Sequence, residues 1–240
     1  MGTIYNKYIL LAFLFTALNA ICGIVGIIVS LYLPEEFLYL PFQLLIFGAI
    51  FDFLDGKMAK RAPMSSSLGA YSDSIGDVIT FAILPGIMLL NAPLLDLGQG
   101  SNTSMFSLGI AGFYTICGWI RLVRFASQPT VIHFDGLPSP AAALLMGSCT
   151  LLARHPEFTW LFPQNGTVLT LITLTIGVLM ILTIKYPTPK RGKTPDMVAI
   201  SIAGIVVLMF VFLPHYLTLA GVLFIAILYT VLGPIYLIRT

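Results

Sequence analysis

Eight apolar stretches of membrane-crossing length fill most of this sequence and leave only short segments between them. About 20 apolar residues cross a bilayer as an α-helix. Only 9% of the 240 residues are charged and 58% are hydrophobic, whereas a soluble domain carries about 25% charged residues. The sequence therefore predicts an all-α polytopic membrane protein with about eight transmembrane helices in one bundle. The predicted crossings are 8–32, 37–60, 66–92, 105–126, 138–153, 165–185, 197–213 and 216–237.

Two details of these stretches shape the expected architecture. The fifth is short and starts at Gly136-Leu-Pro-Ser-Pro140, so we expect an irregular beginning. The first is too long for the apolar core of a signal peptide and lacks a small-residue cleavage pattern. No internal repeat and no soluble segment of domain size is visible, which predicts a single membrane domain over residues 1–240.

The basic residues predict how the bundle is oriented. With eight crossings both termini lie on the same side, and 11 of the 12 Lys and Arg residues then fall on one face, with only Arg154 on the other. Cytoplasmic loops are enriched in Lys and Arg, so we expect both termini in the cytoplasm. The basic, proline-rich loop 185–193 is typical of a topology signal and of attraction to anionic membrane lipids. We expect no nucleic-acid partner.

Four of the ten acidic residues lie within 26 residues of otherwise membrane-like sequence: Asp52, Asp55, Asp73 and Asp77. A carboxylate near lipid is costly unless it is paired or holds a metal. Each pair shares one face of a helix, and the short connection between the pairs predicts antiparallel helices whose carboxylates meet. Oxygen ligands suit Mg²⁺, Mn²⁺ or Ca²⁺, and the absence of His and Cys from this window argues against Zn²⁺.

The surroundings of these carboxylates predict the kind of substrate. Asp73 and Asp77 lie about 10–16 Å from the cytoplasmic end of the third crossing, just beneath the membrane surface. Small residues beside them leave room for a ligand to approach the backbone, and two adjacent cations can bind phosphate oxygens. These are Gly56, Ala59 and Gly69, and Lys60 and Arg61. The residues alone indicate metal-assisted chemistry on a phosphorylated, lipid-linked substrate.

The spacing Asp52-x2-Asp55-Gly56-x2-Ala59-Lys60-x8-Gly69-x3-Asp73-x3-Asp77 resembles the signature of the CDP-alcohol phosphatidyltransferases. The signature usually has Arg where this chain has Lys60, which keeps the charge but loses the bidentate fork, and Arg61 is the alternative donor. Residues 73–85, 121–125, 136–143 and 184–187 resemble the phosphatidylserine synthase branch of the integral-membrane type. Tyr71 stands where that branch commonly has Glu. The resemblance covers about residues 10–190, and helices within 195–240 are less characteristic.

The resemblance implies metal-dependent transfer of a phosphatidyl group from CDP-diacylglycerol, or CDP-archaeol, to L-serine, with release of CMP, in phospholipid biosynthesis. It also implies a homodimer in a prokaryotic cell membrane. Asp77 would be the general base. The metal ligands would be Asp52, Asp55, Asp73 and Asp77. The CDP-lipid would be bound by Asn19, Asp52, Gly56, Ala59, Lys60 and Gly69. The acceptor or phosphates would be bound by Arg61, Arg121, Arg124 and Lys185.

Several alternatives stay open at this point. The acceptor could be glycerol phosphate, inositol phosphate or choline. Arg121 and Arg124 could anchor the helix at the membrane surface, and Asn19 could make only an interhelical hydrogen bond. A cation transporter is the alternative from another class. In such a transporter we would expect the carboxylates near the bilayer midplane on several broken helices, whereas here they are predicted on two adjacent helices toward one surface.

Overall fold

The computed structural model describes residues 2–59, 67–92, 105–127, 134–163, 166–186 and 215–238. Helices make up most of these residues, with one short antiparallel strand pair. The α-helices are α1 (Gly2–Tyr32), α2 (Leu40–Ala59), α3 (Ser67–Asp77), α4 (Leu84–Leu90), α5 (Met105–Ala126), α6 (Ser139–Leu152), α7 (Thr167–Ile181) and α9 (His215–Ile238). The remaining elements are a π-helical segment (Val78–Ile83), two 3-10 helices (Glu35–Phe37 and Pro156–Phe158), β1 (Phe134–Asp135) and β2 (Lys185–Tyr186).

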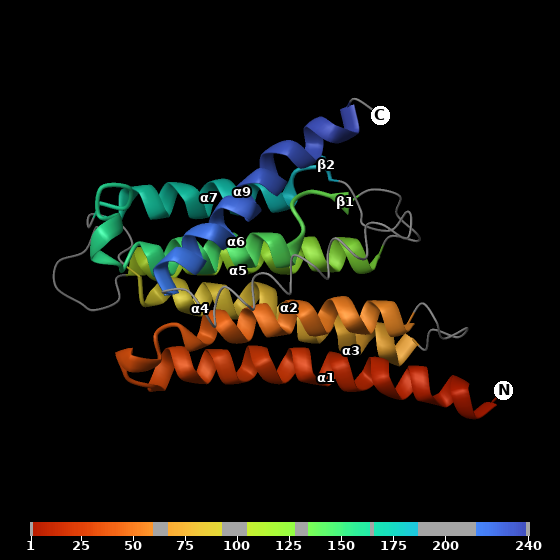
Figure 1. Cartoon of the computed structure of the whole chain (residues 1–240). Coiled ribbons are helices and arrows are strands. Elements are labelled where there is room, and N and C mark those ends of the chain that lie inside the picture. Colours follow the sequence, from red (N-terminus) through yellow and green to blue (C-terminus); the bar gives the residue numbers. More distant parts are fainter. Residues whose placement is uncertain are drawn as a thin grey trace.

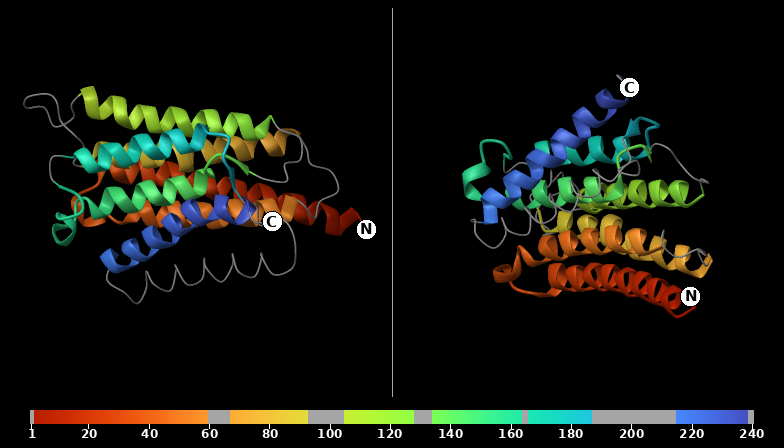
Figure 2. Two further views of the ribbon diagram at one scale, coloured as in Figure 1. Left: turned by 90° about the horizontal axis from the view of Figure 1, so that it is seen from above. Right: turned by 45° about the vertical axis from the view of Figure 1, so that its right-hand side comes forward.

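The helices lie parallel or antiparallel to one common direction, and α9 crosses the others obliquely (Figure 1). Helix α1 packs along α2 and against α3, while α5 packs on α4 and α7. Helix α6 lies between α2, α7 and α9 and contributes the largest share of the buried apolar side chains. Two further views show the same layered arrangement (Figure 2). The end of α2 and the start of α3 lie at the same end of the bundle as the N-terminus (Figure 1).

The helices identify a multi-pass membrane protein, as the sequence predicts. Five helical stretches within the described residues are long and apolar enough to cross a membrane. Helices α6 and α7 are apolar but shorter, with 14 and 15 residues. The predicted crossing 197–213 lies outside the described residues. The all-α membrane fold is therefore confirmed, and the count of eight crossings stays a prediction.

The third predicted crossing is not a uniform α-helix, because a π-helical turn separates α3 from α4. In this turn the N–H of Leu84 donates to the carbonyl of Ile79, five residues back. Pro85 has no N–H to give to the carbonyl of Phe81, four residues before it. The hydroxyl of Tyr114 on α5 donates to that carbonyl instead, at 3.2 Å. The wider turn begins directly after Asp77, so it lies immediately behind the acidic residues.

The helix of the sixth predicted crossing, 165–185, ends four residues earlier than predicted. Helix α7 ends at Ile181, because Leu182 has an extended conformation (φ −59°, ψ 148°) and the chain turns to pair β2 with β1. The irregular start of the fifth crossing is present: Gly136 has φ 81°, and α6 begins at Ser139 after Pro138. A side chain at Gly136 would collide with the carbonyl of Met180, so glycine allows the two backbones to meet.

Candidate active site

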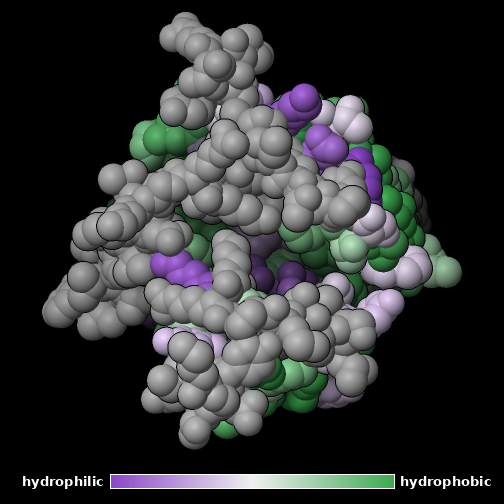
Figure 3. Space-filling view, turned by 90° about the vertical axis from the view of Figure 1, so that its right-hand side faces the viewer, coloured by the Kyte–Doolittle hydropathy of each residue, from purple (hydrophilic) through white to green (hydrophobic). Residues whose placement is uncertain are grey.

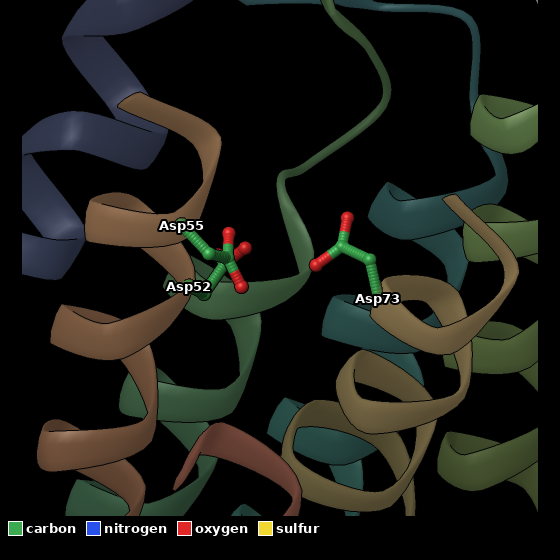
Figure 4. A group of neighbouring side chains, drawn as sticks. All are labelled: Asp52, Asp55 and Asp73. Carbon is green, nitrogen blue, oxygen red and sulfur yellow. The ribbon is translucent and has the colours of Figure 1, made fainter. Parts of the chain in front are cut away.

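Three carboxylates from two helices meet at one point. Asp52 and Asp55 project from α2 and Asp73 projects from α3, and the side chains point toward one another across the gap between the helices (Figure 4). One oxygen from each of them lies within 4.8 Å of the other two. Asp55 is buried, and Asp52 and Asp73 are half-buried. Because like charges this close repel strongly, the arrangement is stable only when a cation or protons neutralise it.

The donor set fits a hard divalent cation. All three groups offer carboxylate oxygens, the ligands that Mg²⁺, Mn²⁺ and Ca²⁺ prefer. Oδ1 of Asp73 is buried and has no hydrogen-bond partner among the described residues, so this oxygen has a coordination position to offer. Oδ2 of Asp55 is already oriented, because the hydroxyl of Thr16 on α1 lies 3.0 Å from it. The cluster can therefore bind a metal ion.

Asp77, the fourth acidic residue of the 52–77 window, is the last residue of α3 and lies one helical turn beyond Asp73. It is not one of the three residues whose oxygens meet within 4.8 Å. Its Oδ1 accepts a hydrogen bond of 2.9 Å from the side-chain amide of Asn19, which is fully buried on α1. Asp77 thus lies outside the cluster of three and is held by Asn19, although its charge still interacts with those of Asp52, Asp55 and Asp73.

Two of the small residues border space that no described residue fills. A side chain at Gly56 would meet no atom of the described residues within 4 Å, and Ala59 is exposed at the end of α2. Gly69 lies in the first turn of α3. Lys60 and Arg61 lie outside the described residues. Seen from this end of the bundle, hydrophilic residues are visible near the centre of the molecule (Figure 3).

Arg121 lies inside the bundle near this site. Its side chain is buried, one Nη atom donates to the hydroxyl of Ser139 at 2.7 Å, and its charge interacts with those of Asp52 and Asp77. A membrane-surface anchor would lie in the head-group region instead. Arg121 is therefore a buried cation whose charge interacts with the acidic residues of the site.

Arg124 has a different environment, although it lies only three residues later on α5. Its guanidinium donates to the carbonyls of Ile181 and Asp135, each at 2.6 Å, and lies 3.5 Å from the carbonyl of Met180. These contacts tie the last turn of α7 and β1 to α5, in agreement with the preference for cations at helix C-termini. The side chain of Lys185, on β2, is exposed.

We expect Arg124→Gln to destabilise the protein more than it weakens substrate binding. Losing hydrogen bonds made by a charged group costs about 1.5–3 kcal/mol, so the midpoint of thermal unfolding in detergent should fall by several degrees. The comparison variant is Arg154→Gln, which removes an ion pair with the exposed Glu35 and a single hydrogen bond to a backbone carbonyl, that of Asn91, and should lower the midpoint less. A raised KM with an unchanged midpoint would instead support phosphate binding by Arg124.

Two partners of the candidate site were not among the site residues predicted from the sequence. Thr16 orients Asp55, and Ser139 binds Arg121. The position of Thr16 offered a signal, because Thr16 and Asn19 are three residues apart and share one face of an apolar helix. Ser139 offered a weaker one, since it lies between two prolines at the irregular start of α6.

Known proteins resemble this chain over most of its length. The family model described as CDP-alcohol phosphatidyltransferase matches residues 9–184. A CDP-diacylglycerol–serine O-phosphatidyltransferase of Methanocaldococcus jannaschii is 32% identical over 98% of this chain and 97% of the relative. An enzyme of the same name from Helicobacter pylori is 30% identical, over 78% and 76%. An archaetidylserine synthase of Methanothermobacter thermautotrophicus is 28% identical, over 76% and 71%.

Proposed function

Because this chain belongs to the CDP-alcohol phosphatidyltransferase family, we propose that it transfers a phosphatidyl or archaetidyl group from the CDP-lipid to L-serine and releases CMP. The observation that carries the proposal is the meeting of Asp52, Asp55 and Asp73 at one point beneath one end of a membrane bundle. The serine acceptor is supported by the relatives, among them a CDP-diacylglycerol–serine O-phosphatidyltransferase that is similar over nearly the whole chain.

We propose that Asp52, Asp55 and Asp73 hold Mg²⁺ or Mn²⁺. A bound divalent ion supplies positive charge that neutralises the pyrophosphate and improves CMP as a leaving group. The three side chains come from two helices, which would hold the cation in one place. The open space beside Gly56 and Ala59 leaves the neighbouring volume for the cytidine nucleotide, and Gly69 lies on the facing helix.

Asp77 is the proposed general base. It accepts the proton of the serine hydroxyl as that oxygen attacks the lipid-side phosphorus, and the bond from this phosphorus to the oxygen of CMP breaks. The hydrogen bond from Asn19 holds Oδ1 of Asp77, which leaves Oδ2 for the proton. Direct attack fits better than a covalent aspartyl intermediate, because a carboxylate committed to a cation is a poor nucleophile.

The remaining binding roles follow the charges. The buried guanidinium of Arg121 is proposed to bind the serine carboxylate or a substrate phosphate. Lys60, Arg61 and Lys185 are proposed phosphate ligands.

We further propose that the carboxylate end of the bundle and both termini face the cytoplasm of a prokaryotic cell, as the distribution of Lys and Arg favours, and that the protein forms a homodimer.

The proposal is tested with purified protein, CDP-diacylglycerol or CDP-archaeol, Mg²⁺ or Mn²⁺, and one acceptor at a time. We expect CMP release to depend on L-serine and to stop when EDTA removes the metal ion. The comparison acceptors are glycerol phosphate, inositol phosphate and choline, each at the same concentration. Release with one of these acceptors but not with serine would overturn the acceptor and keep the reaction class. No metal-dependent CMP release with any acceptor would contradict the proposed activity.

A further inference from the structure

The hydrogen bond that holds Asp77 is itself supported by a buried residue in the π-helical turn. Thr80 and Asn19 are both fully buried. The hydroxyl of Thr80 donates to the backbone carbonyl of Asn19 at 2.9 Å. The side chain of Asn19 in turn donates to Asp77. Two hydrogen bonds thus connect the π-helical turn to α1 and α1 back to the carboxylate of Asp77.

Two glycines make room for this contact. A Cβ atom at Gly23 on α1 would lie 2.5 Å from the hydroxyl of Thr80 and 3.0 Å from its Cα. A Cβ atom at Gly48 on α2 would lie 2.6 Å from the methyl group of Thr80 and 3.0 Å from Oδ1 of Asn19. Since Cβ atoms are essentially never found as close as 2.5 or 2.6 Å to another heavy atom, the two glycines let α1, α2 and the π-helical turn close around Thr80.

The geometry also explains why a threonine suits this position. Asp77 and Thr80 both reach toward α1, because each is hydrogen-bonded to Asn19. The hydroxyl contacts one helix and the methyl group fills the space against the other. A buried side chain with both contacts has no freedom to rotate, and the helix it holds carries Asn19.

We propose that Thr80 is a positioning residue, which acts through Asn19 to fix the side chain of Asp77 in the orientation that accepts the proton of the acceptor alcohol. Thr80 is fully buried and its hydroxyl is bonded to the backbone of Asn19, so the proposal gives it no direct contact with the substrate. The inference rests on the proposed role of Asp77, and on no property of the acceptor beyond its hydroxyl.

The test is Thr80→Val, which replaces the hydroxyl by a methyl group of nearly the same size. We expect kcat to fall about tenfold, the effect of one lost hydrogen bond on a reacting geometry, while KM for the CDP-lipid changes by less than about twofold. Thr80→Ser keeps the hydroxyl and should recover at least about a third of the kcat. Binding of CMP with Mn²⁺, measured by calorimetry without turnover, should be unchanged in both variants.

The matched control is Thr173→Val on α7, a fully buried threonine whose hydroxyl donates at 2.8 Å to the carbonyl of Leu169 in its own helix. It removes the same group far from Asp77 and should leave kcat unchanged. Combining Thr80→Val with Asn19→Ala should lower kcat no further than Asn19→Ala alone, because both act through one contact. Additive losses, an unchanged kcat in Thr80→Val, or an equal loss in Thr173→Val would each overturn the inference. An inactive wild-type protein would instead contradict the proposed function.

Discussion

Replacing Asp55 by asparagine is expected to lower the affinity for Mn²⁺ by more than about 100-fold, since even the loss of a residue that only supports a metal ligand costs 10–100-fold. Turnover at a fixed metal concentration should fall on the order of 1,000-fold, because the charge that offsets the pyrophosphate is then missing. Asparagine keeps an oxygen of the same size, so it can still accept the hydrogen bond from Thr16. Calorimetric titration with Mn²⁺ measures the affinity, and CMP release measures turnover.

The fold of the variant can be followed separately. Without metal, three carboxylates with oxygens within 4.8 Å of one another repel, and the substitution removes one of the charges. The metal-free variant should therefore unfold at a temperature no lower than that of the metal-free wild type. Mn²⁺ should raise the midpoint of the wild type but not that of the variant. Asp135→Asn on β1 is the matched control, and an Asp55→Asn variant that binds Mn²⁺ as tightly as this control would show that Asp55 is not a ligand.

The sequence predicts the helices and the meeting of the carboxylates for a simple reason. Apolar length decides whether a helix crosses the membrane, and the spacing of Asp52, Asp55 and Asp73 decides which helix face each carboxylate occupies. A short connection makes α2 and α3 antiparallel, and both helices pack against α1. Residues near in sequence and regular in structure therefore carried enough information to place these three side chains.

What the sequence could not predict depends on contacts between distant segments. Nothing in the spacing indicates the π-helical turn, which arises where Pro85 removes an N–H and Tyr114, 33 residues from Phe81, satisfies the carbonyl. The partner of Asp77 likewise lies 58 residues away on α1. The different environments of Arg121 and Arg124 depend on α6 and α7, whose positions relative to α5 no local pattern encodes.

Substituting Asp77 is expected to have a different effect from substituting one of the other three acidic residues of the site. Asp52, Asp55 and Asp73 meet one another, whereas Asp77 accepts a hydrogen bond from Asn19. Substituting a metal ligand should weaken metal binding and turnover together. Substituting a base that takes no essential part in metal binding should reduce turnover alone. The two classes of residue can therefore be separated by the same pair of measurements.

Asp77→Asn should lower kcat by about 100- to 10,000-fold, the contribution of a general base. The amide oxygen of asparagine still accepts the hydrogen bond from Asn19, so the side chain keeps its place while losing the ability to take a proton. Binding of Mn²⁺ and of the CDP-lipid, measured by calorimetry, should stay within about threefold of the wild type. If Asp77→Asn lowers the Mn²⁺ affinity as much as Asp55→Asn does, Asp77 acts mainly as a metal ligand. Normal turnover with normal binding would remove Asp77 from the chemistry, and the proton of the acceptor hydroxyl would then have to leave to another group.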